Sequence, residues 1–118
     1  MRIEHWTNAA EMAQHGAATL LHDLGLRSND PGPYTPLPYF WSDQYGHKIQ
    51  FLGRITGFDE VRVVAGSIEE GSWLALYRRA DRVVGALGVT KMRMLMKSRK
   101  LLLDSGSWDD AIQLVEAM

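Results

Sequence analysis

The chain has 118 residues, of which 46% are hydrophobic, with no cysteine and a formal net charge of -1 at pH 7. This length suits one domain with its own core, but not a multidomain enzyme. The lack of cysteine excludes disulfides, thiolate catalysis and iron-sulfur ligation by this chain, and the near-neutral charge gives no sign of nucleic-acid binding. No apolar run reaches the length of a membrane span and the N-terminus does not follow the order of a signal peptide, so we expect a cytoplasmic protein without a membrane partner.

The first predicted element is a helix over residues 7–24, where small and apolar side chains recur at intervals of three and four. Thr7 or Asn8 is expected to cap its start, with Glu11 completing a capping box, and Gly25 is expected to end it in the left-handed conformation. Alanine and glycine on the apolar side of this helix indicate a close approach to the element that it packs against.

A loop with three prolines, residues 27–36, leads into segment 38–44, which holds the consecutive rings of Tyr39, Phe40 and Trp41. Side chains of an extended segment alternate between its two faces, so Tyr39 and Trp41 share one face and Phe40 takes the other. Either this is an edge strand whose rings all pack on neighbouring elements, or one of its faces is free to meet a partner.

Short runs of alternating or continuous apolar character follow, with glycines between them, and they predict strands. The residue pair Ala80 and Asp81 is short enough for a tight hairpin. We expect an antiparallel meander from these strands. They cover residues 48–52, 61–65, 72–79 and 82–89.

Helical spacing returns over residues 91–103. A last helix is expected after Ser107 as its N-cap, with Asp110 in its first turn. The order of helix, strands and helices predicts an α+β domain, in which an antiparallel sheet of about five strands is flanked by an N-terminal helix and two C-terminal helices.

No motif in the chain indicates an enzyme that works on its own. There is no glycine-rich dinucleotide fingerprint and no phosphate-binding loop. The four histidines lack the spacing of metal ligands, so no metal site is predicted. Ser42 and Asp43 have no histidine at the spacing of a nucleophilic triad.

Two features remain as candidates for binding. Arg93, Lys97 and Lys100 project from one side of the penultimate helix, where they form either a docking surface for an acidic protein or an ordinary solvated face. Rings also gather around the first helix, with Trp6 before its start and Trp41 in the aromatic segment. Flat rings near helix amides suit a planar, partly anionic heterocycle.

Three segments in this order carry a family resemblance. They are RIEHWTNA at residues 2–9, PYFWSDQY at residues 38–45 and KIQFLG at residues 48–53. Together they resemble the C-terminal part of the flavin-dependent ferredoxin reductases, a family that includes the reductase components of aromatic-ring dioxygenases. The valine-rich runs further along the chain also fall in the family's order, although only the aromatic Trp-Ser-Asp-Gln element is specific.

The resemblance implies that FAD- and NAD-binding domains belong to the complete enzyme and are not in this chain. Residues 1–25 would be a helix that continues from the FAD domain, and residues 26–118 the C-terminal domain of the reductase. FAD is the implied cofactor of the complete enzyme. By carry-over, His5 and Trp6 lie beside the flavin, and Trp41 lines the side from which electrons leave.

The implied partners are the FAD/NAD-binding half and an acidic ferredoxin-type iron-sulfur protein. The residues implied to dock the ferredoxin are Lys48, Gln50, Arg93, Lys97 and Lys100. The hypothesis is therefore a domain that covers the flavin, shapes the acceptor surface and is inactive alone, with Trp41 toward the flavin and Phe40 in the core between sheet and helices. The alternative is a stand-alone interaction module or homodimer that uses Trp41 and its apolar neighbours as the interface.

Overall fold

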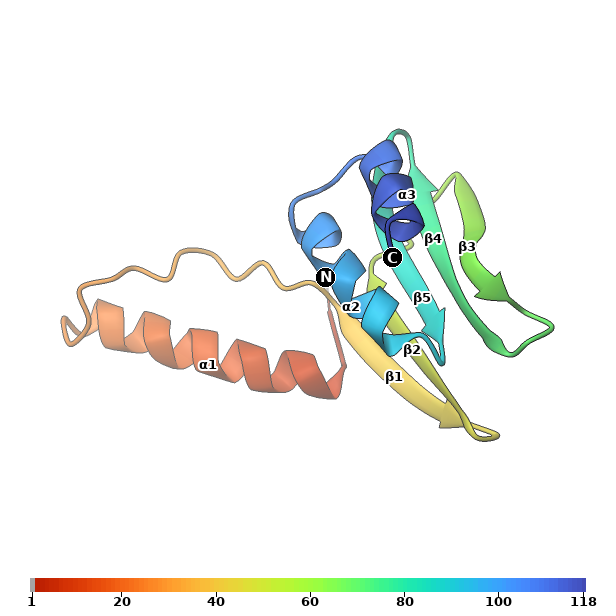
Figure 1. The fold of residues 1–118 in the computed structure, drawn as a ribbon. Helices are drawn as coiled ribbons and strands as arrows, with labels where there is room; N and C mark the ends of the chain where they lie inside the picture. The colour runs from red at the N-terminus through yellow and green to blue at the C-terminus, as the bar shows by residue number, and fades with distance from the viewer. Residues whose placement is uncertain (1) are drawn as a thin grey trace.

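The computed structural model describes residues 2–118 as one antiparallel sheet with a long helix before it and two helices after it (Figure 1). The elements are α1 (Trp6–Asp23), β1 (Tyr39–Gln44), β2 (His47–Gly53), β3 (Glu60–Ser67), β4 (Ser72–Arg79), β5 (Arg82–Val89), α2 (Met92–Leu103) and α3 (Trp108–Glu116). Helices α2 and α3 lie on one face of the sheet, whereas α1 extends away from it with the following loop running back alongside (Figure 1). The predicted α+β fold with five strands is confirmed.

The order of the strands differs from the predicted meander. They lie in the order β1-β2-β5-β4-β3, since the chain crosses after β2 to the far edge, forms β3 there and returns through β4. Strand β5 then fills the place between β4 and β2. Its small residues suit this central position: Ala86 is fully buried, and a Cβ atom added to Gly88 would lie 3.4 Å from the Cβ atom of Leu95 in α2. The central strand thus lets α2 approach the sheet closely.

The hydrophobic core lies between the sheet and the two C-terminal helices. Its buried members come from β2, β4, β5, α2 and α3: Leu52, Leu74, Leu76, Val83, Ala86, Leu95, Leu102, Trp108, Ala111 and Val115. Burial of each large apolar side chain contributes about 1.5–3 kcal/mol. This layer is therefore the main source of stability for the part of the chain from β1 onward.

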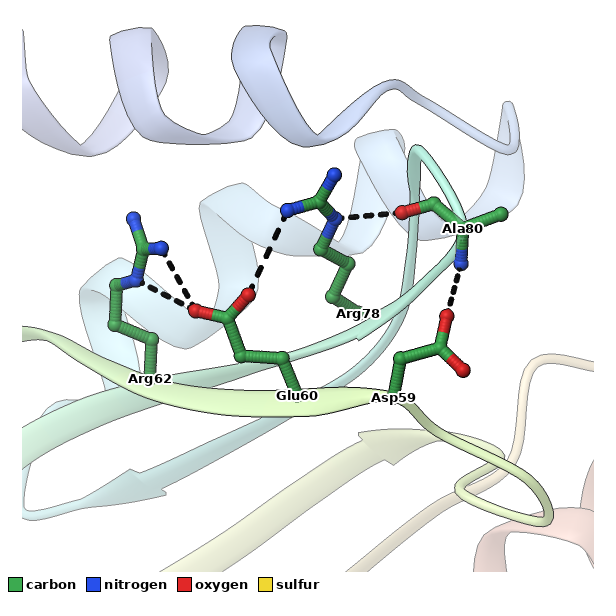
Figure 2. Close-up of polar contacts among 5 residues, drawn as sticks. All are labelled: Asp59, Glu60, Arg62, Arg78 and Ala80. Atoms are coloured by element: carbon green, nitrogen blue, oxygen red, sulfur yellow. Dashed lines mark hydrogen bonds and ion pairs between the residues drawn. The ribbon is translucent and has the colours of Figure 1, made fainter.

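A charged cluster fastens α3 to the edge of the sheet through Trp108. The guanidinium carbons of Arg62 and Arg78 lie 5.3 and 5.6 Å from the ring centre of Trp108, within the range of a cation-π contact. The carboxylate of Glu60 accepts from Arg62 at 2.7 Å and pairs with Arg78 at 3.5 Å (Figure 2). One carboxylate thus holds both cations against the same buried ring.

The β4–β5 hairpin turns at Ala80 and Asp81, as predicted. Ala80 takes a φ angle of 53°, a left-handed conformation that is uncommon for a residue with a Cβ atom. Its backbone N–H donates to Asp59 at 2.6 Å and its carbonyl oxygen accepts from Arg78 at 2.5 Å (Figure 2). Satisfaction of both polar groups offsets the cost of this conformation.

Two of the predicted helix boundaries are confirmed. Ser107 caps α3, because its hydroxyl oxygen accepts from the backbone N–H of Asp110 at 3.1 Å. After α1, Gly25 takes a φ angle of 72°. Its N–H and that of Leu26 bond to carbonyl oxygens of the last helical turn, which is the hydrogen-bond pattern of a Schellman motif.

The predicted capping box at the start of α1 is wrong. The helix begins at Trp6, and no side chain caps its first turn. Asn8 instead ties the helix to the residues before it and to the loop after it, since its amide nitrogen donates to the carbonyl oxygen of Ile3 at 3.0 Å and its amide oxygen accepts from Tyr34 at 2.8 Å. Glu11 faces Arg99 of α2 at 4.0 Å. The first N–H groups of α1 therefore have no side-chain partner.

Replacement of Trp108 by alanine should lower the free energy of unfolding by about 3–5 kcal/mol, because it leaves a cavity in the core and removes the contact of two guanidinium groups. Urea unfolding followed by circular dichroism measures the loss. The matched control is Trp6→Ala, at a ring that is 77% exposed, which should cost less than about 1 kcal/mol. Equal losses for the two variants would contradict the role assigned to Trp108.

Candidate functional site

His5 and Trp6, at the start of α1, pack against side chains on both faces of the edge strand β1. The ring centre of His5 lies 5.0 Å from that of Phe40, and the ring of Trp6 meets that of Trp41 edge-on at 6.0 Å. Because Phe40 and Trp41 are neighbours in a strand, their side chains project to opposite faces. We call these four residues the aromatic clamp. It joins α1 to the sheet.

The rings of the clamp remain open to the outside. Trp6 is 77% exposed, Trp41 is 40% exposed and Phe40 is 39% exposed. A pocket of about 290 Å³ lies among them. Its lining residues are Glu4, His5, Trp6, Tyr39, Phe40 and Trp41. The three residues predicted from the resemblance to bind a cofactor, His5, Trp6 and Trp41, thus line one pocket.

The buried side-chain amide of Gln50 holds in place Tyr39, whose ring packs against Trp41. The ring of Tyr39 stacks on that of Trp41 at 5.7 Å, and the Tyr39 hydroxyl accepts a hydrogen bond from Gln50 Nε2 at 2.8 Å. Gln50 is only 1% exposed and stands opposite Trp41 in the register of β1 and β2. The hydrogen bond between Gln50 and Tyr39 therefore holds in place the ring against which Trp41 packs.

The predicted docking role of Gln50 does not fit its position. Its side chain points to the same face of β2 as that of Leu52, a core residue, because the two are two residues apart in a strand. A partner protein cannot reach a side chain buried beneath α2 and β1, so Gln50 is removed from the docking residues. The period of two in this strand was the signal that could have shown it.

A row of rings crosses the face of the sheet that α2 and α3 do not cover. Phe40 stacks on Phe51 at 5.6 Å, Phe51 meets Tyr77 at 5.7 Å, and Tyr77 meets Phe58 at 5.1 Å. Gly85 of β5 makes room for the row, since a Cβ atom there would lie 2.9 Å from the Phe51 ring. We call these four residues the aromatic row.

The position of Phe40 in this row corrects a prediction. Phe40 does not enter the core between sheet and helices, because alternation along β1 gives that face to Tyr39, which packs against the core. The aromatic row itself was not foreseen. Its members come from four separate segments, and only the strand order brings Phe51 and Tyr77 to either side of β5.

The basic residues predicted to dock a partner do not form one uniformly positive patch. Arg93, Lys97 and Lys100 are exposed on α2, as expected. Lys97 and Lys100 line a groove of about 450 Å³ between α2 and α3 that also contains the carboxylates of Asp104 and Asp110. Lys48 Nζ pairs with Asp43 at 2.9 Å across the β1–β2 hairpin. Acidic neighbours thus offset part of the positive charge.

Titratable groups near the clamp are few. Nδ1 of His5 is buried and has no hydrogen-bond partner among residues 2–118. The pKa of Tyr34 is raised above its ordinary value, first by desolvation of its hydroxyl and second by the carboxylate of Glu11.

Among residues 2–118, no group of three histidine or carboxylate side chains could hold a metal ion. No helix in this range has the length and apolar character needed to cross a membrane.

Several solved structures share both the fold and the sequence pattern. The chain is similar to Fdr9, with 32% identity and a TM-score of 0.77 over 94% of this chain and 28% of that chain. It is similar to the ferredoxin reductase for the CYP199A2 system from Rhodopseudomonas palustris, with 34% identity and a TM-score of 0.79 over 99% of this chain and 28% of that chain. It is also similar to the covalent putidaredoxin reductase-putidaredoxin complex, with 26% identity and a TM-score of 0.78 over 99% of this chain and 28% of that chain.

The shared fold and its matches define the class of the domain, which is the C-terminal domain of ferredoxin reductases. The sequence pattern of the family described as "Reductase C-terminal" matches residues 39–117, from the first residue of β1 to just beyond α3. The chain belongs to this family, and the resemblance seen in the sequence is confirmed. Helix α1 lies outside the matched range, and the chain spans 28% of the length of each similar structure.

Replacement of Tyr39 by phenylalanine should lower the free energy of unfolding by about 1–3 kcal/mol, because it leaves the Gln50 amide buried without a partner. Adding Gln50→Leu to that variant should recover most of the loss, since the unpaired polar group is then gone. Urea unfolding of the single and double variants measures this coupling, with Tyr45→Phe at a 99% exposed ring as the control. A double variant whose loss equals the sum of two separate losses would contradict it.

Proposed function

We propose that this chain is the flavin-covering and acceptor-docking domain of an FAD- and NADH-dependent ferredoxin reductase. In this proposal it acts with the FAD/NAD-binding half and is inactive alone. The observation that carries the proposal is the open aromatic clamp in a member of the Reductase C-terminal family. The exposed rings of Trp6, Phe40 and Trp41 form one contiguous apolar surface, which a flat cofactor or another domain would cover.

The residues of the clamp fit a flavin. Helix α1 begins without a side-chain cap and without an acidic residue in its first turn, so its free N–H groups favour an electron-rich edge. The rings of Trp6 and Trp41 offer flat apolar surfaces beside that helix end. FAD, when bound, supplies the transfer of hydride and of single electrons. His5, Trp6 and Trp41 would hold it and shield it from water.

Helix α1 also supports the proposal that residues 1–25 pack against the FAD domain and residues 26–118 form the C-terminal domain. Its exposed apolar side chains include Met12, Leu20 and Leu21, and the exposed Leu24 follows at its C-cap. An amphipathic helix normally buries such a stripe. The contacts of α1 with the rest of the chain are the clamp, the contacts of Asn8 and His15 with Tyr34, and the Glu11–Arg99 pair, and they leave these apolar side chains exposed. Another domain would complete its packing.

We assign the aromatic clamp and the helix-free face of the sheet to one partner, and the exposed side of α2 to another. The helix-free face, with the aromatic row and the exposed Val61 and Val63, is apolar and suits the FAD/NAD-binding half. The α2 side, with Arg93, Lys97 and Lys100 exposed, suits an acidic ferredoxin-type iron-sulfur protein that also approaches Lys48. One similar structure is putidaredoxin reductase joined covalently to putidaredoxin, which supports a partner of this kind in the proposal.

The alternative function is a stand-alone interaction module that forms a homodimer. The same exposed surface favours it, because two copies could cover Trp41 and the apolar stripe of α1 with each other. The two functions differ in what they need. The reductase domain requires a flavin-bearing partner of different sequence, whereas the dimer requires only a second copy of this chain. A cytoplasmic location stays a prediction under both.

Mixing the purified chain with a separately expressed FAD/NAD-binding half should restore NADH-dependent reduction of a ferredoxin, measured by absorbance. Trp41→Ala should lower the restored rate at least about tenfold, because it opens the flavin site to water and removes a packing surface. Tyr45→Ala, at an exposed hairpin tip, is the matched control and should leave the rate unchanged. The proposal fails if neither the chain nor the mixture binds flavin while the chain forms a stable dimer that Trp41→Ala dissociates.

A further inference from the structure

A separate pocket lies at the end of the sheet where β1 begins and β2 ends. Its volume is about 360 Å³, within the range of about 300–1,000 Å³ that is common for sites of small molecules. Part of its wall is apolar, with the buried side chains of Val83 and Leu102. The rest is polar and basic, with Arg54, Thr56 and Arg79. None of these residues belongs to the aromatic clamp.

The two arginines of this pocket have no acidic partner. Among residues 2–118, the ion pairs involve other cations, and no carboxylate lines the pocket. The carboxylate of Asp59 is engaged elsewhere, since it accepts from the N–H of Ala80. Arg54 and Arg79 therefore place two positive charges on one concave surface, and an anion bound there would offset their mutual repulsion.

Hydrogen bonds hold the walls of the pocket in place. The N–H of Arg54 donates to the carbonyl oxygen of Val84 at 2.9 Å, and the N–H of Gly53 donates to that of Pro38 at 2.8 Å. Gly53 has a φ angle of 96°, and a Cβ atom there would lie 2.3 Å from the carbonyl oxygen of Val84. Ser105, which also lines the pocket, accepts at its backbone oxygen from Arg82.

We propose that this pocket binds an organic phosphate. The phosphate group lies between Arg54 and Arg79, whose planar guanidinium groups each donate two parallel hydrogen bonds to such oxygens. The hydroxyl groups of Thr56 and Ser105 add two donors to the four of the guanidinium groups, and this total exceeds the roughly four acceptor sites of a single carboxylate. The apolar part of the ligand rests against Val83 and Leu102. Because of this apolar wall, an organic phosphate binds more tightly than inorganic phosphate.

Isothermal titration calorimetry of the full chain tests the site with phenyl phosphate, inorganic phosphate and benzoate as probes. Phenyl phosphate should bind more tightly than either of the others. Arg54→Gln and Arg79→Gln should each weaken phenyl phosphate at least about tenfold, because each removes charged hydrogen bonds. Arg93→Gln, the same charge change on the exposed face of α2, should weaken it less than about twofold. Amide NMR shifts should be largest at Arg54, Thr56 and Ser105.

Three results would overturn the proposal. The first is no saturable heat up to about 10 mM phenyl phosphate, a range in which even a millimolar site fills. The second is equal weakening by Arg93→Gln, which would mean a general response to charge. The third is inorganic phosphate binding as tightly as phenyl phosphate, which would leave the apolar wall without a role. Both arginines are exposed, so the variants should fold, and Arg54→Lys, which keeps the charge but not the paired donors, should still weaken binding.

Discussion

The structure depends on the small residues Gly85, Ala86 and Gly88 of the central strand β5. In β5, Gly88 lets Leu95 of α2 approach one face of the sheet. On the other face, Gly85 leaves room for the ring of Phe51 from β2 to meet that of Tyr77 from β4. Such close packing on both faces of one strand needs residues whose side chains are absent or small. The helix-covered core and the aromatic row are therefore two consequences of the same few residues. They give the sheet one closed face and one open face.

The open face and the clamp meet at β1, and this junction links the fold to the proposed function. Phe40 belongs to both, because it contacts His5 on one side and Phe51 on the other. Trp41 points to the opposite face, where Tyr39 and the buried Gln50 support it. The edge strand is thus held rigid from within the sheet while its outer rings stay exposed. A binding surface on a rigid element loses little conformational entropy when a partner covers it.

Features that depend on neighbouring residues could be predicted from the sequence. The Ser107 cap, the left-handed Gly25 and the hairpin at Ala80 each depend on a few adjacent residues, and all three are confirmed. Strand order could not be predicted, because the pairing of β5 with β2 joins segments far apart in the chain. Asn8 was misread for a similar reason, since its partner Tyr34 lies 26 residues away. The gathering of His5, Trp6 and Trp41 in one pocket was foreseen only through the family resemblance.

The central claim is that the clamp and the helix-free face meet the FAD/NAD-binding half. Hydroxyl-radical footprinting with mass spectrometry tests it directly, by comparing the oxidation of exposed side chains in the chain alone and in the presence of that half. We expect protection of Trp6, Trp41 and Phe58, all of which are exposed in the chain alone, and unchanged oxidation of Met92 and Leu103 on α2. Protection of α2 with the three rings still reactive would contradict the account.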